Sequence, residues 1–147
     1  MTEMPELAGI ETLVFLQSVD LFRHCRAEEV VRLAAIASEH SFAAGERVYE
    51  QGDAADALFC VVRGAVALEG PGGERRRVGP LVAFGVVEVL LGRMRATSAV
   101  AEGDTLALVI EADDFFDLLA NNIEIVKALF RQFVQPEQAL AAAGGSR

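Results

Sequence analysis

The sequence has few of the residues on which metalloenzymes and disulfide-rich proteins depend. Its 147 residues include only two cysteines and two histidines. Cys25 and Cys60 cannot form a disulfide framework, and free thiols suit a reducing compartment. A metal site on a small barrel needs two or three histidines and a carboxylate on adjacent strands. His24 and His40 lie apart, one between two expected helices and one at a helix-to-strand junction. The sequence therefore predicts no enzyme, with no catalytic residue, cofactor or metal ligand.

Basic residues are scarce as well. The chain has 13 lysines and arginines against 22 aspartates and glutamates, a net charge of −9. Proteins that bind nucleic acids neutralise phosphates with clustered basic side chains. The only basic run, Arg75–Arg77, is interpreted as a solvated strand beside a turn, with an anion-binding patch as the alternative. The sequence predicts no nucleic-acid partner.

Long hydrophobic runs are also missing, although 52% of the residues are hydrophobic. The longest apolar run, around residues 81–91, is broken by Glu88 and is about half as long as a membrane-spanning helix. The first residues are acidic where a secretory signal would be basic. We expect a cytoplasmic protein that does not bind membranes.

The hydrophobic pattern divides the chain into three parts. Apolar residues recur at helical spacing over about residues 8–37 and again over about 112–135. Between them, about residues 38–111 contain short apolar runs separated by glycines, a pattern typical of a compact antiparallel barrel or sandwich. We expect one domain over residues 1–136 and a flexible tail over residues 137–147.

The last expected helix carries a wide apolar stripe, which Pro136 ends. Core packing against the barrel accounts for about three of its five residues. The others are available to cover a ligand or to contact an effector protein or a second copy of the chain. The stripe consists of Ile123, Val126, Leu129, Phe130 and Phe133.

Helices, about eight short strands and helices again follow the order of the cyclic-nucleotide-binding domain family, which residues 12–134 resemble. The segment "FGVVEVLLGRMRATSAVA", which begins at Phe84, is similar to that family's phosphate-binding cassette. The resemblance implies a mainly β fold with flanking helices, in which eight antiparallel strands form a jelly-roll-like barrel. A transcription activator of this family would need a helix-turn-helix domain after the barrel, and we expect no room for one after Pro136.

The family pattern of the cassette is Phe-Gly-Glu, a short helical turn, and then Arg-Ala-Ala or Arg-Ala-Thr. In that pattern Gly85 lets the backbone approach a cyclic phosphate, and Arg95 neutralises it. Ala96 resembles members that favour adenine. The alternative for Arg95 is a surface arginine paired with a carboxylate. The resemblance implies the following ligand-binding residues: Phe84, Gly85, Val86, Val87, Arg95, Ala96 and Thr97.

One position departs from the family pattern. The family glutamate that binds the ribose 2′-hydroxyl is replaced by Val86. Glu88 lies two residues on, about 200° around a helical turn, and is interpreted as an outward-facing solvated carboxylate. The sequence therefore predicts a stand-alone regulatory domain that binds cyclic AMP weakly or takes another small anion. An interaction module that keeps only the fold is the alternative.

Overall fold

The structure is a computed structural model, and it describes residues 7–134. Two helices and a short 3₁₀ helix come first: α1 (Gly9–Ser18), η1 (Asp20–Phe22) and α2 (Ala27–Ala35). Five strands follow: β1 (Ala37–Phe42), β2 (Arg47–Tyr49), β3 (Ala57–Arg63), β4 (Val66–Glu69) and β5 (Arg75–Val78). The remaining elements are β6 (Ala83–Phe84), α3 (Val86–Leu91), β7 (Ser98–Ala101), β8 (Thr105–Glu111), α4 (Ala112–Ala120) and α5 (Ile123–Phe133).

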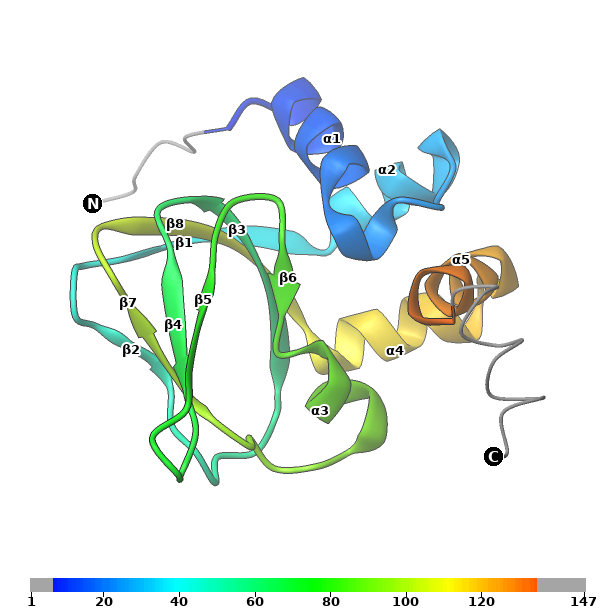
Figure 1. Cartoon of the computed structure of the whole chain (residues 1–147). Helices are drawn as coiled ribbons and strands as arrows, with labels where there is room; N and C mark the ends of the chain where they lie inside the picture. Colours follow the sequence, from blue (N-terminus) through cyan, green and yellow to red (C-terminus); the bar gives the residue numbers. More distant parts are fainter. Residues whose placement is uncertain (1–6, 135–147) are drawn as a thin grey trace.

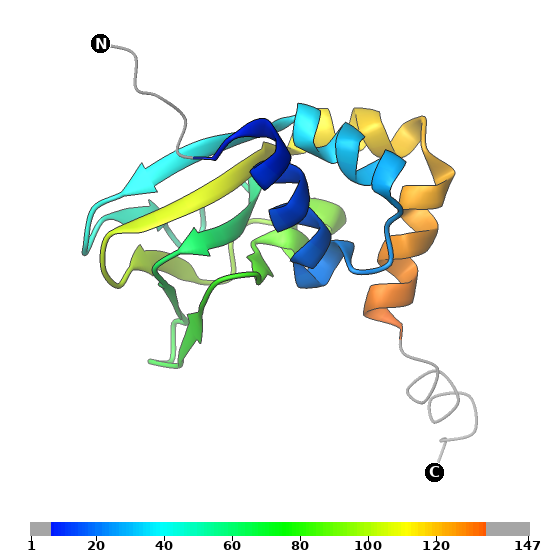
Figure 2. The ribbon, with the colours of Figure 1, turned by 90° about the horizontal axis from the view of Figure 1, so that it is seen from above.

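The eight strands form two four-stranded sheets in which every pairing is antiparallel. One sheet has the order β1-β8-β3-β6 and the other β2-β7-β4-β5. Figure 1 shows the sheets facing each other on one side of the molecule, and Figure 2 shows α2, α4 and α5 together at one end. The predicted fold, mainly β and jelly-roll-like with flanking helices, is confirmed. The predicted tail lies outside the described residues.

The sheet that contains β3 and β8 is covered on both faces. Leu58 and Cys60 of β3 pack in the cluster formed with the helices, whereas Phe59 and Val61 pack in the cluster between the two sheets. Because successive residues of a strand point to opposite faces, a strand covered on both sides is apolar throughout. Cys60 is fully buried.

The helices bury most of the faces that their sequences predicted, except in α5. Leu16 and Phe22 are buried at the amino-terminal end, as expected. The stripe predicted for α5 is wrong: Leu129 alone among its five residues is buried, and Phe130 is 64% exposed. The buried face of α5 is instead formed by Ile125, Ala128 and Leu129. Ala128, with its small side chain, lies on this buried face. The helix is therefore rotated relative to the orientation that the stripe predicted.

The structure also bears on the membrane prediction and on the basic run Arg75–Arg77. No helix within residues 7–134 is long and apolar enough to span a membrane. In the β4–β5 hairpin Glu69 pairs with Arg75, so the turn falls at the glycines of residues 70–73. Arg75 and Arg77 are exposed and both pair with Glu102, which fits the predicted solvated strand.

Candidate ligand-binding site

The centre of the candidate site is the short connection from β6 to α3. Gly85 caps the start of α3 with a φ of 75°, a left-handed conformation that residues with a Cβ rarely adopt. A Cβ at this position would lie 2.8 Å from Nη1 of Arg95. Glycine is therefore required here both by the backbone and by the close approach of an arginine of the same chain.

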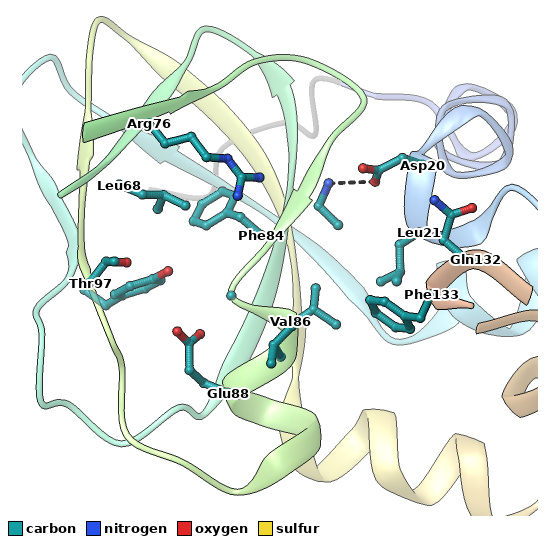
Figure 3. Close-up of a pocket in the computed structure, with 14 residues that line it drawn as sticks. Asp20, Leu21, Leu68, Arg76, Phe84, Val86, Glu88, Thr97, Gln132 and Phe133 are labelled. Atoms are coloured by element: carbon teal, nitrogen blue, oxygen red, sulfur yellow. Dashed lines mark hydrogen bonds between the residues drawn. The ribbon is translucent and has the colours of Figure 1, made fainter. Parts of the chain in front are cut away.

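A cavity of about 370 Å³ opens beside this connection. Figure 3 shows residues from both sheets, from η1 and from α3 pointing into it. Of the seven predicted ligand-binding residues, Arg95 and Ala96 are not in its wall, and the other five are: Phe84, Gly85, Val86, Val87 and Thr97. The structure thus brings most of the predicted site together around one cavity and places its arginine behind the wall.

Arg95 is buried, with only 2% of its surface exposed. Its Nη1 donates to the carbonyl oxygen of Gly85 at 2.8 Å, and its Nη2 donates to the carbonyl oxygen of Ala57. The guanidinium carbon lies 4.0 Å from the centre of the Tyr49 ring, in cation–π contact. Nε of Arg95 has no hydrogen-bond partner among residues 7–134. The alternative of a surface arginine is therefore wrong about location, although Arg95 does pair with a carboxylate.

That carboxylate belongs to Glu88. Its Oε1 lies 3.2 Å from Nη1 of Arg95, and its Oε2 accepts a hydrogen bond from the backbone N–H of Ala96 at 3.3 Å. The Glu88 side chain is only 17% exposed and points into the cavity in Figure 3. The sequence-based interpretation of an outward-facing, solvated Glu88 is wrong.

The packing around α3 explains the error. Val86 is 6% exposed and packs in the cluster formed with the helices, so its side of α3 faces the core. Glu88 lies on another side of this short helix, which is also covered, because Arg95 and Ala96 approach it and contact the carboxylate. The sequence does not show that the segment after α3 packs against the helix in this way.

The opposite end of the cavity contains Asp20, which the sequence did not identify, and Arg76, which belongs to the basic run interpreted as a solvated strand with an anion-binding patch as the alternative. Asp20 of η1 accepts a hydrogen bond from the backbone N–H of Ala83 at 3.0 Å, which joins the helical end to β6 (Figure 3). Arg76 of β5 stands opposite Leu68 and points into the cavity. Strand alternation could have placed these last two on one face, but only with the register of the hairpin known.

Tyr49 contributes a phenol to the cavity wall. Burial raises its pKa, against the opposing effects of the Arg95 charge and a side-chain hydrogen bond with Thr97. The phenol is therefore protonated at neutral pH and available for hydrogen bonding.

Burial affects the two thiols of the chain. Burial, with a contribution from the charge of Glu29, raises the pKa of Cys25 to about 11, and burial also raises the pKa of Cys60. Neither thiol is therefore an activated nucleophile. Within residues 7–134, no group of three or more histidine, cysteine, aspartate or glutamate side chains is arranged to hold a metal ion.

Comparisons with known proteins support the family resemblance. The family model described as "Cyclic nucleotide-binding domain" matches residues 39–122. A putative potassium channel protein from Rhodopseudomonas palustris is 29% identical over 114 residues, which are 76% of this chain and 28% of that protein. The chain thus spans little more than a quarter of the length of this relative.

Two solved structures show the same fold. The amino-terminal domain of a transcriptional regulator from Streptomyces coelicolor is 25% identical, with a TM-score of 0.73 over 90% of this chain and 96% of that chain. A triple mutant of the regulatory subunit of a cAMP-independent protein kinase A from Trypanosoma brucei, bound to cAMP, is 18% identical, with a TM-score of 0.72 over 92% of this chain and 50% of that chain. The chain belongs to the cyclic-nucleotide-binding domain family.

Proposed function

We propose that this domain is a regulatory, non-enzymatic module that senses a small ligand in the cavity beside Gly85, and that it binds cyclic AMP weakly. The observation that carries the proposal is Val86, a buried apolar side chain in the cavity wall where the family has the ribose-binding glutamate. The proposed ligand-binding residues are those of the cassette: Phe84, Gly85, Val86, Val87, Arg95, Ala96 and Thr97.

The effect of Val86 can be given a size. A hydrogen bond to a charged group contributes about 1.5–3 kcal/mol to binding. Its absence corresponds to a weakening of about 10- to 100-fold. A nucleotide that relies on a carboxylate at this position therefore binds much less tightly here, whereas a ligand without a ribose hydroxyl loses nothing.

The relative from Trypanosoma brucei supports weak binding of cyclic AMP. It is described as cAMP-independent, and the form seen with cAMP carries three substitutions. They replace a glutamate by alanine and, seven and eight positions later, a threonine by arginine and a valine by alanine. Glu88, Arg95 and Ala96 have the same spacing in this chain. By this comparison the chain has the favourable arginine and alanine but keeps the glutamate.

A regulatory domain must pass its signal on, and α5 offers a surface for this. Ile123 and Phe130 of α5 are both more than 60% exposed. We propose that this helix contacts an effector protein or a second copy of the chain. The same exposed residues favour the second candidate function, an interaction module that keeps the fold without binding a nucleotide.

The experiment that tests the proposal compares Val86→Glu with Val86→Gln. The glutamine side chain has the size of the glutamate side chain but carries no charge. Cyclic AMP and adenosine are each titrated by calorimetry into the wild type and both variants. Adenosine carries the ribose hydroxyls but no phosphate, so it reports the ribose end alone. We expect Val86→Glu to bind adenosine about 10- to 100-fold more tightly than Val86→Gln.

Circular dichroism spectra must show that both variants remain folded, because position 86 is buried. Equal adenosine affinity of the two folded variants would contradict a ribose-binding role for this position. If neither cyclic AMP nor adenosine binds to any of the three proteins, the interaction module is favoured.

A further inference from the structure

Glu88 places a carboxylate where the cassette is expected to receive the anionic group of its ligand. Its two oxygens accept from Nη1 of Arg95 and from the backbone N–H of Ala96. The first donor belongs to Arg95, to which the resemblance assigns phosphate binding, and the second belongs to the next residue of the cassette. We infer that Glu88 acts as a tethered anion that fills the phosphate position of this site, so that an external anion reaches Arg95 only after Glu88 has turned away.

The burial of the two partners supports this assignment. Arg95 is 2% exposed and does not line the cavity, whereas Glu88 does line it. Glu88 therefore lies between the guanidinium and the space that a ligand can enter. Nη1 of Arg95 already donates to Glu88 and to the carbonyl oxygen of Gly85, so neither of its two hydrogens is left for a phosphate.

The charges of the site lead to the same conclusion. Arg95 and Glu88 form an ion pair, so together they carry no net charge toward an entering ligand. A cyclic phosphate that approached this end of the cavity would meet a carboxylate first, and like charges at close range repel. The neutral pair thus accepts an uncharged group in the cavity and disfavours an anion.

The inference deepens the proposed function, on which it rests, by naming what controls the phosphate end of the same cavity. Val86 weakens the ribose end and Glu88 closes the phosphate end, and the two effects are separable. As long as Glu88 stays in place, cyclic AMP gains nothing from its phosphate and binds no more tightly than adenosine.

The first test uses inorganic phosphate as the probe, because it needs no nucleoside pocket. Phosphate is titrated into the wild type, Glu88→Ala and Glu88→Gln, with Glu28→Gln as a control that makes the same change of charge on an exposed position of α2. Nuclear magnetic resonance follows the backbone amide of Ala96 and the Nε–H of Arg95. Glu88→Gln keeps the side-chain size, so it remains informative if the alanine variant unfolds.

We expect saturable shifts of both resonances in the two Glu88 variants, with phosphate affinity at least tenfold above that of the wild type and of Glu28→Gln. Adding Arg95→Gln to Glu88→Ala should remove the gain. Equal shifts in the wild type would show that the anion position is open despite Glu88. Absence of phosphate binding in the folded Glu88 variants would show that these donors form no anion site. Either result overturns the inference.

The second test separates the inference from the proposed function. Cyclic AMP and adenosine are titrated into the wild type and Glu88→Ala. We expect Glu88→Ala to raise the affinity for cyclic AMP by about 10- to 100-fold and to leave that for adenosine nearly unchanged. If phosphate binds to Glu88→Ala but neither cyclic AMP nor adenosine binds to it, the tethered anion is supported and the nucleotide pocket is not. An equal gain in affinity for cyclic AMP and for adenosine would contradict the tethered anion. Glu88 would then affect binding in the cavity in general and not binding of the phosphate.

Discussion

Two arginines stand near the two ends of one cavity in opposite environments. Arg95 is buried, stacked on Tyr49 and held by two carbonyl oxygens and the Glu88 carboxylate. Arg76 is exposed on β5, points into the cavity and forms no ion pair with any of residues 7–134. Arg95, which belongs to the cassette motif, is therefore already paired within the chain. Arg76, which lies outside the motif, is accessible.

The comparison shows that a motif identifies a side chain without identifying its state. The spacing from Gly85 to Arg95 matches the family pattern, and the structure does bring the two into contact. Whether that arginine is available to a ligand depends on Glu88, which lies outside the residues that the pattern specifies. An arginine whose hydrogen bonds and ion pair are made within its own chain contributes to the stability of the fold before it contributes to ligand binding.

Arg95→Ala should have the largest effect on the comparison. It leaves the partly buried Glu88 carboxylate without a cation and the carbonyl oxygens of Gly85 and Ala57 without a donor. Breaking a buried ion pair from one side costs about 3–5 kcal/mol, and we expect the free energy of unfolding in urea to fall by about that much.

The matched measurement is Arg95→Ala in a Glu88→Ala background. With no carboxylate left behind, the second substitution should cost less than it does in the wild type, and the difference is the coupling between the two side chains. A loss below 1 kcal/mol for Arg95→Ala alone would show that the buried arginine is no structural element, and the contrast with Arg76 would disappear.

The glycines at the two ends of α3 offer a second, smaller test. Gly85 and Gly92 both have positive φ, 75° and 66°. A Cβ at Gly92 would have no atom within 4 Å, whereas one at Gly85 would lie 2.8 Å from Nη1 of Arg95.

We therefore expect Gly92→Ala to cost about 1 kcal/mol from the left-handed backbone alone. Gly85→Ala should cost about 1 kcal/mol more, because the guanidinium is held in place and cannot withdraw freely. Urea unfolding of the two variants measures the difference. Equal losses would mean that Arg95 moves away at no cost and is less firmly fixed than its contacts indicate.

Much of the fold could be predicted from the sequence, because it depends on local periodicity. Helical spacing at both ends and short apolar runs between glycines are visible without the structure, and so is the cassette around Gly85. Five of the seven proposed site residues line the cavity, and four of these five are consecutive, Phe84–Val87.

The remaining features depend on contacts between distant segments. Val86 is buried against helices far away in the sequence and Glu88 is covered by Arg95, and no local pattern contains either contact. The buried face of α5 likewise depends on η1 and α4 rather than on its own stripe. Asp20 is joined to the site by hydrogen bonds to Leu81 and Ala83, the latter 63 positions later in the chain.

Arg76→Ala should have the smallest effect and defines the other side of the comparison. Because Arg76 is exposed and has no ion pair within residues 7–134, its loss should change the free energy of unfolding by less than about 0.5 kcal/mol. In the Glu88→Ala background its charge attracts phosphate only through solvent. We therefore expect less than a tenfold loss of phosphate affinity, and that loss should vanish at about 1 M salt, where charges are screened within about 3 Å. Titrations of Glu88→Ala and of Glu88→Ala/Arg76→Ala at low and high salt measure both quantities. If the second variant no longer binds phosphate at either salt concentration, Arg76 holds the anion, and the assignment of the phosphate position to Arg95 is wrong.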